Sequence, residues 1–347
     1  MTVLPLAELV PRAGGPSPLL ELRDLSVSFP VQQGEIRPVN GLDLKIGRGE
    51  TVALVGESGS GKSITSLAVM RLLPPQARIQ GQILWHDDKG LATDFGGLSA
   101  RAMRSIRGND IAMIFQEPMT SLNPLQTAGQ QIVEAIRLHR RMPRADATAQ
   151  AISLLELVGI PEPKRRLGNL PHEMSGGIRQ RIMIAMALAC RPSLLIADEP
   201  TTALDVTVQA QILHLIRRFQ RELGMSVLFI THDLGVVAEI AERMIVLYAG
   251  RVVETGTVRQ VLSSPLHPYT KGLLNSVPRV RDPSHRLDAI PGMVPEWSNM
   301  PPGCAFAPRC RHAVSGRCDV RLPMLEPAGA DRDVRCLRWQ ELAETRQ

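Results

Sequence analysis

The chain has 347 residues, of which 44% are hydrophobic and 21% charged, with a mean hydropathy of −0.01 and a formal net charge of +6. This length predicts one large domain plus an appendage, and the composition is typical of a well-packed globular protein rather than a disordered or membrane-spanning one. Only 3% of the residues are aromatic and no basic stretch is interleaved with them, which argues against a nucleic-acid stacking platform.

Residues 1 to about 18 contain Pro and Gly without periodicity, and we expect a flexible tail there. From residue 19 to about 260, short apolar runs alternate with amphipathic segments, which predicts an α/β domain with a largely parallel sheet. Strands are expected at 51–55, 111–115, 194–197, 227–230 and 244–248. Helices are expected at 62–73, 178–189 and 206–223.

Two further regions differ in pattern from this alternation. Residues from about 118 to 191 are mostly helical in pattern, which predicts a helical subdomain inserted between strands. Residues 261–347 begin in a Pro-rich stretch and contain four of the five Cys, so we expect a C-terminal appendage there. The most apolar stretch, 182–197, is interrupted by Arg191 and Pro192, short of the ~20 residues that a spanning helix needs. With no signal peptide visible, a cytoplasmic location is expected.

The segment Gly56-Glu-Ser-Gly-Ser-Gly-Lys62-Ser63 has the spacing of a phosphate-binding loop, and it lies between an expected strand and an expected helix. Glycines let backbone N–H groups converge on phosphate oxygens, and a helix N-terminus adds its positive dipole end. Lys62 would reach the β- and γ-phosphates and Ser63 would coordinate magnesium, so we expect ATP binding. The expected nucleotide-binding residues are Gly56, Glu57, Ser58, Gly59, Ser60, Gly61, Lys62, Ser63 and Ile64.

Two acids, Asp198 and Glu199, follow the apolar strand at 194–197. Ligands of open α/β sheets bind at the carboxyl ends of the strands, so Asp198 is expected to hold magnesium and Glu199 to polarise the attacking water. Gln116 and His232 also follow expected strands and are expected at the same edge, as further catalytic residues, with Gln116 also a magnesium ligand. Phe29 lies on an upstream strand, where stacking on adenine and simple core packing both remain open.

Met174-Ser175-Gly176-Gly177-Ile178 lies shortly before the acidic strand, with Ser175 113 positions after Lys62. Together with the motifs above and the loop Thr202-Ala-Leu-Asp205, it resembles the nucleotide-binding subunit of an ABC transporter over roughly residues 19–278. In that family two subunits enclose two ATP molecules, each between one phosphate loop and the partner's signature segment, which here implies contacts from Ser175, Gly176 and Gly177. The usual segment reads Leu-Ser-Gly-Gly-Gln, and Ile178 lacks the amide that could bond the nucleotide.

Three longer segments narrow the resemblance to the D-type ATPase of dipeptide and oligopeptide permeases. They are Phe115-Gln-Glu-Pro-Met-Thr-Ser-Leu-Asn-Pro124, Leu170-Pro-His-Glu-Met-Ser-Gly-Gly-Ile-Arg-Gln180 and His267-Pro-Tyr-Thr-Lys-Gly272. The resemblance implies an ATPase that energises peptide import from the cytoplasmic face of the bacterial inner membrane. It implies two transmembrane permease subunits, an extracytoplasmic binding protein and a second ATPase, either F-type or an identical copy, as partners. Nickel and glutathione importers share much of these sequence segments, so nickel and glutathione remain alternatives for the cargo.

Cys304, Cys310, Cys318 and Cys336 lie close together near the C-terminus. In a cytoplasmic protein such clustering favours metal over disulfides, but the C-x2-C pairs usual for zinc are absent. Four thiolates can also hold a four-iron four-sulfur cluster, and Gly303-Cys-Ala-Phe-Ala-Pro-Arg-Cys310 resembles the C-terminal domain of peptide-permease ATPases, in some of which such a cluster is known. A cluster, zinc and reduced thiols all remain open. Cys190, in an apolar helix, is expected to be core packing.

Two other functions fit the sequence less well. Soluble ABC ATPases that act on DNA carry long coiled coils between the phosphate loop and the signature segment, and 113 positions leave no room for one. Those that act on ribosomes carry two nucleotide domains on one chain, whereas this chain has one phosphate loop. A metal-sensing regulatory module would account for the cysteines and leave the nucleotide motifs unexplained. No nucleic-acid partner is therefore expected.

Overall fold

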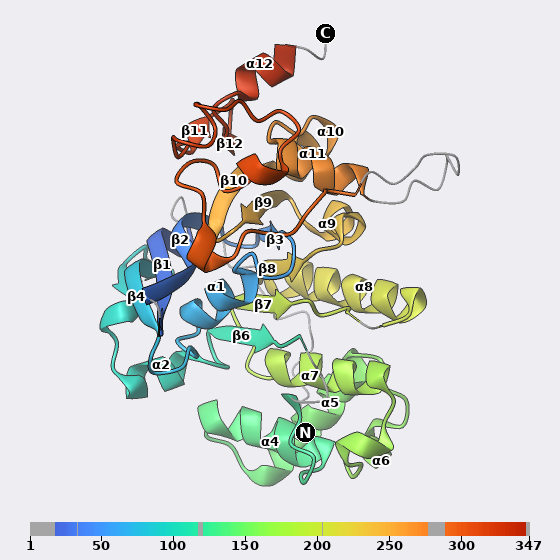
Figure 1. Ribbon diagram of the computed structural model, residues 1–347. Helices are drawn as coiled ribbons and strands as arrows, with labels where there is room; N and C mark the ends of the chain where they lie inside the picture. The colour runs from blue at the N-terminus through green and yellow to red at the C-terminus, as the bar shows by residue number, and fades with distance from the viewer. Residues whose placement is uncertain (1–17, 33, 117–120, 203, 277–288, 345–347) are drawn as a thin grey trace. The chain divides into compact units, whose positions relative to one another are not determined.

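The computed structural model describes residues 18–32, 34–116, 121–202, 204–276 and 289–344, so most of the expected tail at 1–18 lies outside the described residues. The chain divides into two compact units, whose helices and strands are labelled in Figure 1. Apart from its N-terminal end, the first unit comprises residues 46–50 and 85–230, and the second comprises 21–45, 51–84 and 231–347. No helix in the described ranges combines the length and the apolar composition needed to cross a membrane.

The first unit contains three parallel strands in the order β8-β7-β6: β6 (Ile111–Ile114), β7 (Leu194–Asp198) and β8 (Ser226–Thr231). β7 and β8 are buried along their whole length, as expected for parallel strands covered on both faces. The remaining strand and short helices of this unit are β5 (Ala92–Asp94), η2 (Phe95–Gly97), α2 (Ala100–Ile106) and η3 (Pro171–Glu173).

Between β6 and β7 the described elements are all helical, as the sequence pattern predicts. They are α4 (Ala128–His139), α5 (Arg144–Leu157), α6 (Pro163–Arg166), η3 and α7 (Gly176–Leu188). The helices α4, α5 and α7 pack against one another, and Thr127 caps α4 with a capping box to Gln130. β7 is followed by α8 (Val206–Leu223), which Asp205 caps through the backbone N–H of Val208.

The second unit contains two groups of paired strands. The first has the order β2-β1-β4: β1 (Leu20–Val31), β2 (Gly34–Ile46) and β4 (Arg78–His86). The other has the order β11-β12-β10-β9-β3: β3 (Thr51–Val55), β9 (Arg243–Tyr248), β10 (Arg251–Thr257), β11 (Glu326–Pro327) and β12 (Asp333–Val334). β3 pairs with β9 in parallel, and β10 pairs antiparallel with both β9 and β12. The helices are α1 (Lys62–Val69), α9 (Leu234–Ile240), α10 (Val258–Ser263), α11 (Pro268–Asn275), η4 (Trp297–Asn299), η5 (Ala307–Arg309) and α12 (Trp339–Glu344).

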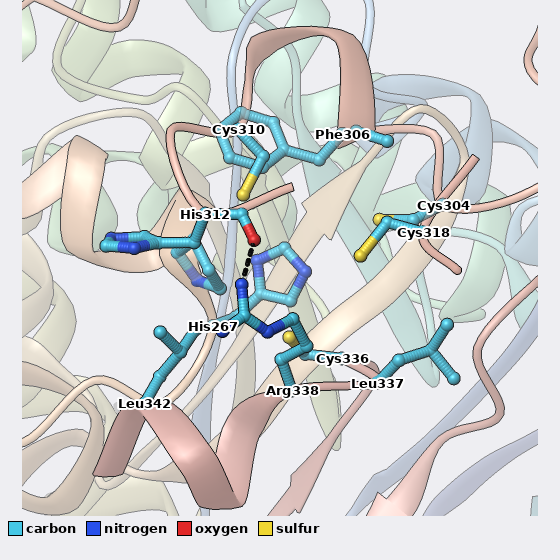
Figure 2. Close-up of a pocket in the computed structure, with 12 residues that line it drawn as sticks. His267, Cys304, Phe306, Cys310, His312, Cys318, Cys336, Leu337, Arg338 and Leu342 are labelled. Atoms are coloured by element: carbon cyan, nitrogen blue, oxygen red, sulfur yellow. Dashed lines mark hydrogen bonds between the residues drawn. The ribbon is translucent and has the colours of Figure 1, made fainter. Parts of the chain in front are cut away.

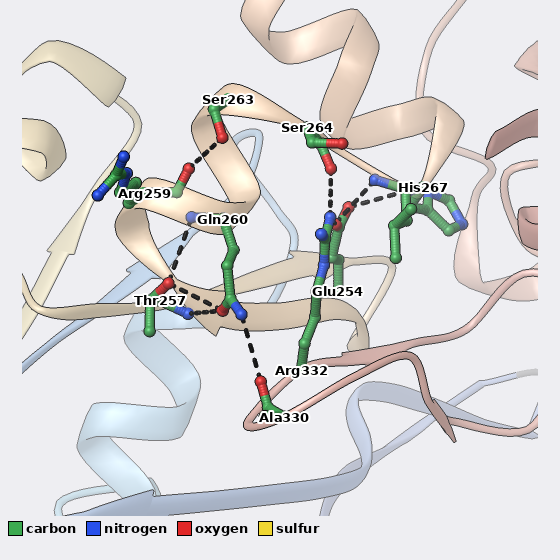
Figure 3. Close-up of polar contacts among 10 residues, drawn as sticks. Glu254, Thr257, Arg259, Gln260, Ser263, Ser264, His267, Ala330 and Arg332 are labelled. Atoms are coloured by element: carbon green, nitrogen blue, oxygen red, sulfur yellow. Dashed lines mark hydrogen bonds and ion pairs between the residues drawn. The ribbon is translucent and has the colours of Figure 1, made fainter. Parts of the chain in front are cut away.

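The C-terminal region is joined to β10 by strand pairing and by one buried carboxylate. Glu254 of β10 lies opposite Val334 of β12 and is fully buried. Its carboxylate accepts hydrogen bonds from the backbone N–H groups of Leu266 and His267, and from Arg332 Nη2 at 2.7 Å (Figure 3). A buried charge is tolerated where it is paired and hydrogen-bonded, as here.

The α/β fold predicted from the sequence is confirmed, and each of the five expected strands lies within one or two residues of its predicted bounds. The helix expected at 62–73 ends earlier, at Val69. Arg71 has a φ of 49°, in the left-handed region, and a residue that precedes a proline, as Leu73 does, is disfavoured in the α conformation. The domain boundaries predicted at 18, 118, 191 and 260 stay a prediction.

Candidate functional site

The predicted phosphate loop connects the buried strand β3 to helix α1, in the second unit. Gly61 is the N-cap residue of α1 and has a φ of 101°, which residues other than glycine rarely adopt. A Cβ at Gly61 would lie 2.1 Å from the carbonyl oxygen of Pro38, and one at Gly56 would lie 2.3 Å from that of Leu247. The first and last glycines of the loop are therefore required by close backbone approach as well as by conformation.

Lys62 begins helix α1 and is only 6% exposed. Its ammonium donates hydrogen bonds to the carbonyl oxygens of Gly56 at 2.8 Å and Glu57 at 3.0 Å, so it lies across the loop. Ser60 in the same loop is 1% exposed and its hydroxyl oxygen has no hydrogen-bond partner among the described residues. A buried cation, a helix N-terminus and an unsatisfied hydroxyl in one loop are suited to binding an anion such as a phosphate group.

Glu57 of this loop is held by residues that the sequence did not single out. Its carboxylate accepts hydrogen bonds from Arg309 at 2.7 and 3.1 Å, and its backbone N–H donates to Tyr269 Oη at 2.9 Å. Burial raises the pKa of Tyr269, so this phenol stays neutral at physiological pH. Arg309 and Tyr269 lie in segments that carried the family resemblance, but no spacing rule places either beside residue 57.

Asp198 ends β7 in the first unit, and Glu199 follows it directly. Asp198 is 4% exposed, and Glu199 has a φ of 46°, so the chain turns sharply directly after the strand. The Glu199 carboxylate accepts hydrogen bonds from Gln116 Nε2 at 3.2 Å and from Thr202 Oγ1 at 2.9 Å, while its backbone N–H donates to Ile230 O. The structure thus brings the predicted catalytic residues Gln116 and Glu199 together, and it adds Thr202.

The predicted signature segment lies at the start of α7, in the first unit. Ser175 is the N-cap residue, and its side chain makes no capping hydrogen bond. Ser175 and Gly176 are exposed, whereas a Cβ at Gly177 would approach Val208 at 3.3 Å. Met174 is buried and Ile178 half-buried, so the hydroxyl and first glycine face solvent while their neighbours pack inward.

The other candidate residues lie in or next to strands β1 and β8 and helix α1. His232 is exposed directly after β8, and Phe29 is partly exposed near the end of β1 and is not part of the fully buried core. Ser63 and Ile64, in the first turn of α1, are half-buried, and Ser58 and Gly59 are exposed. Their roles toward a nucleotide, and those of His232 and Phe29, stay predictions.

The four C-terminal cysteines line a single pocket, together with His267, Phe306 and Arg338 (Figure 2). The backbone N–H of Cys304 donates to the carbonyl of Cys318 at 2.8 Å, and a Cβ at Gly303 would lie 2.3 Å from that same oxygen. Burial raises the pKa of the Cys304 and Cys310 thiols, and raises that of Cys336 to about 12.

These cysteines do not form a closed ligand set. Within the described ranges, no three or more His, Cys, Asp or Glu side chains converge closely enough to hold a metal ion. Four thiols around one pocket are the donor set of a zinc or iron–sulfur site, but their sulfur atoms remain apart here (Figure 2). Cys190, by contrast, is buried in the first unit and donates to the carbonyl oxygen of Ala135, as expected for a core residue.

Comparison with known proteins agrees with this geometry. Residues 39–202 match the family model described as ABC transporter, and residues 253–318 match the one described as oligopeptide/dipeptide transporter, C-terminal region. The oligopeptide transport ATP-binding protein OppD of Bacillus subtilis is 50% identical over 311 residues, which cover 89% of this chain and 86% of that protein. The oligopeptide transport ATP-binding protein AppD of the same organism is 48% identical over 325 residues, covering 94% and 98%.

Among solved structures, the dimeric post-hydrolysis state of the ATP-binding cassette MJ0796, bound to ADP and Pi, is similar in fold. It is 29% identical to this chain with a TM-score of 0.62, and the match covers 69% of this chain and 99% of that one. The phosphate loop, the acidic strand end and the signature helix therefore occur in a chain that matches such proteins over most of its length. The chain belongs to the ABC transporter family and is one of its ATPases.

Proposed function

We propose that this chain is the ATP-hydrolysing subunit that energises import of dipeptides or oligopeptides through a membrane permease. The observation that carries the proposal is the buried Lys62, whose ammonium lies across the glycine loop between Gly56 and Glu57. The peptide cargo is supported by the C-terminal region at 253–318 and by relatives named for oligopeptide transport. Nickel and glutathione are the alternative cargoes.

In this proposal the phosphate loop, from Gly56 to Ile64, binds the triphosphate, and Phe29 stacks on the adenine. Ser63, Gln116 and Asp198 hold the magnesium ion, for which hydroxyl, amide and carboxylate oxygens are suitable donors. When bound, magnesium neutralises charge that develops on the phosphates. Glu199 orients the attacking water as general base, assisted by His232.

The signature segment Ser175-Gly176-Gly177 binds the nucleotide of a second ATPase subunit, either an identical copy or an F-type relative. Its support is the solvent-facing hydroxyl and N-terminus of α7. The other proposed partners are two transmembrane permease subunits and, indirectly, an extracytoplasmic binding protein. The proposed location is the cytoplasmic face of the bacterial inner membrane, with the chain bound peripherally.

Lys62→Ala tests the nucleotide site. Without the ammonium, the chain should lose tight ATP binding in equilibrium titrations with a fluorescent ATP analogue. Lys164→Ala, on the exposed helix α6, is the matched control and should bind as the unmodified chain does. Undiminished affinity in the Lys62 variant would remove the loop from the proposed site.

The cargo requires a different experiment, gentle purification of the tagged chain from native membranes with partners identified by mass spectrometry. Recovery of two multi-span permeases with a peptide-binding protein supports the proposal. A binding protein for nickel or glutathione would reassign the cargo while leaving the ATPase unchanged. Recovery of soluble partners alone would contradict the importer.

We further propose that the four-cysteine pocket accepts a metal centre, a four-iron four-sulfur cluster in preference to zinc. Its support is that Cys304, Cys310, Cys318 and Cys336 all line one pocket. Such a centre would require the four sulfur atoms to move closer together and the thiols to lose their protons on binding. Anaerobic purification followed by iron, sulfide and zinc analysis tests it. Cys310→Ser should lower the amount of bound metal, whereas Cys190→Ser should not. Metal-free protein would mean that the four cysteines are reduced thiols without a metal centre.

A further inference from the structure

Glu57 in the phosphate loop is held by polar contacts on three sides. Its carboxylate accepts two hydrogen bonds from the Arg309 guanidinium, at 2.7 and 3.1 Å. Its backbone N–H donates to Tyr269 Oη at 2.9 Å, and its carbonyl oxygen accepts from Lys62 Nζ at 3.0 Å. The loop residue that helps to hold the Lys62 ammonium is therefore itself held by two residues from the C-terminal region.

Arg309 is fixed by its own surroundings and is only 8% exposed. Its Nε donates to the carbonyl oxygen of Pro291 at 3.0 Å, and its guanidinium lies 5.8 Å from the ring centroid of Tyr248 and 6.0 Å from that of Phe306. A planar guanidinium held in this way presents a ready-made fork to a carboxylate. Little conformational freedom is lost when Arg309 pairs with Glu57.

The main chain around Arg309 is equally constrained. It belongs to the short helix η5, where the N–H of Ala307 donates to Cys304 O and the N–H of Cys310 donates to Ala307 O. Phe306, at the start of this turn, packs edge-on against Tyr248 at 5.2 Å and against Tyr269 at 5.4 Å between ring centroids. The arginine therefore projects from a rigid turn toward the loop, next to the aromatic cluster that supplies the Tyr269 hydroxyl.

We propose that Arg309 and Tyr269 are positioning residues for the phosphate loop, which they hold through Glu57 in the conformation that binds the triphosphate. The proposal rests on the assignment of the loop around Lys62 as the nucleotide site. The two residues act through Glu57 and not on the nucleotide. If the loop is correctly arranged only part of the time, the apparent affinity falls by that fraction, while saturating ATP restores the arrangement.

This predicts a separation between KM and kcat. Arg309→Ala should raise the KM for ATP about 10- to 100-fold, the range expected for losing a charge-assisted bidentate pair, with kcat at saturating ATP largely kept. Arg309→Lys keeps the charge but loses the fork and should give a smaller rise. Tyr269→Phe removes only the hydroxyl that accepts the hydrogen bond from the Glu57 backbone N–H, and it should also raise the KM. The control is Arg317→Ala, an arginine of the same region that pairs with Glu341, and its KM should not change.

A double-mutant cycle separates positioning from general destabilisation. If Arg309 acts through Glu57, the Glu57→Gln variant should already contain most of the loss, and adding Arg309→Ala should raise KM little further. Additive effects, or an unchanged KM in the Arg309 and Tyr269 variants, would overturn the proposal. Thermal unfolding shows whether Arg309→Ala folds. If it does not, Arg309→Lys and Tyr269→Phe, which conserve side-chain size, test the proposal by the same change in KM. Retained binding in Lys62→Ala would instead overturn the site assignment itself.

Discussion

The side-chain amide of Gln116 donates a hydrogen bond to the Glu199 carboxylate across 3.2 Å, joining the ends of the neighbouring parallel strands β6 and β7. Thr202 Oγ1 contacts the same carboxylate at 2.9 Å from the following turn. Both donors orient Glu199 without neutralising it, because neither carries a charge. A carboxylate held in this way at the end of a parallel strand is placed where ligands of open α/β sheets bind.

Glu199→Gln should therefore remove the proposed general base while keeping the shape of the strand end. We expect turnover to fall by about 10²–10⁴-fold, the usual effect of removing a general base, with ATP affinity retained. Steady-state ATPase assays and equilibrium nucleotide titrations measure the two quantities separately. Glu222→Gln, near the end of α8, is the control and should hydrolyse ATP normally. Undiminished turnover in the Glu199 variant would exclude it as the base.

Gly61→Ala tests the close approach of the loop to β2. The new Cβ would lie 2.1 Å from Pro38 O at a φ of 101°, so the loop must shift or the residue must strain. We expect the free energy of unfolding to fall by about 2 kcal/mol or more, and ATP binding to be lost with it. Urea unfolding and nucleotide titration measure these effects. Gly97→Ala, where an added Cβ meets nothing within 4 Å, should change neither, and a Gly61 variant of normal stability would contradict the predicted clash.

The sequence predicts features that depend on local patterns, but not contacts between residues far apart in the chain. The order strand, glycine loop and helix around Lys62 is a local pattern, and the structure places β3 and the start of α1 where that pattern put them. Gln116 and Glu199 could be paired because polar residues after neighbouring parallel strands share one edge. Arg309 lies 252 positions from Glu57, so only the folded chain brings the two together.

The cysteines represent an intermediate case. Their clustering in the sequence predicted a common location, and all four line one pocket. Whether their sulfur atoms converge depends on turns around Gly303 and Pro308 that no spacing rule describes. The early end of α1 has a similar origin, because the left-handed Arg71 and the prolines beyond it override an amphipathic pattern.

The Cys336 thiol should react slowly in the metal-free folded chain. Because burial raises the pKa of Cys336 to about 12, its thiolate fraction at neutral pH lies about 1,000-fold below that of an ordinary thiol. Iodoacetamide labelling followed by peptide mass spectrometry measures each cysteine separately. We expect Cys336 to label far more slowly in the folded chain than in urea, where burial is lost. Equal rates in the two conditions would contradict the raised pKa of this thiol.

We expect His267 to make the stability of the chain depend on pH. It is 1% exposed, its Nδ1 accepts from the backbone N–H of Tyr269 at 3.0 Å, and burial lowers its pKa from 6.5 to about 3. The folded chain therefore keeps a neutral imidazole in a pH range where the unfolded chain binds a proton. This stability is fully present above pH 6.5 and is lost progressively as the pH falls toward 3, at about 1.4 kcal/mol per pH unit.

His267→Asn should flatten this dependence, because Asn retains a side-chain acceptor suited to capping α11 but does not titrate. Between pH 7 and pH 5 we expect the unmodified chain to lose about 2 kcal/mol more unfolding free energy than the variant does. Urea unfolding at several pH values measures the difference. His214→Asn, exposed on α8, should follow the unmodified curve. If the pH profiles of the unmodified chain and the His267 variant run parallel, the imidazole binds protons equally in the folded and unfolded chains, and its burial next to Phe306 does not lower its pKa.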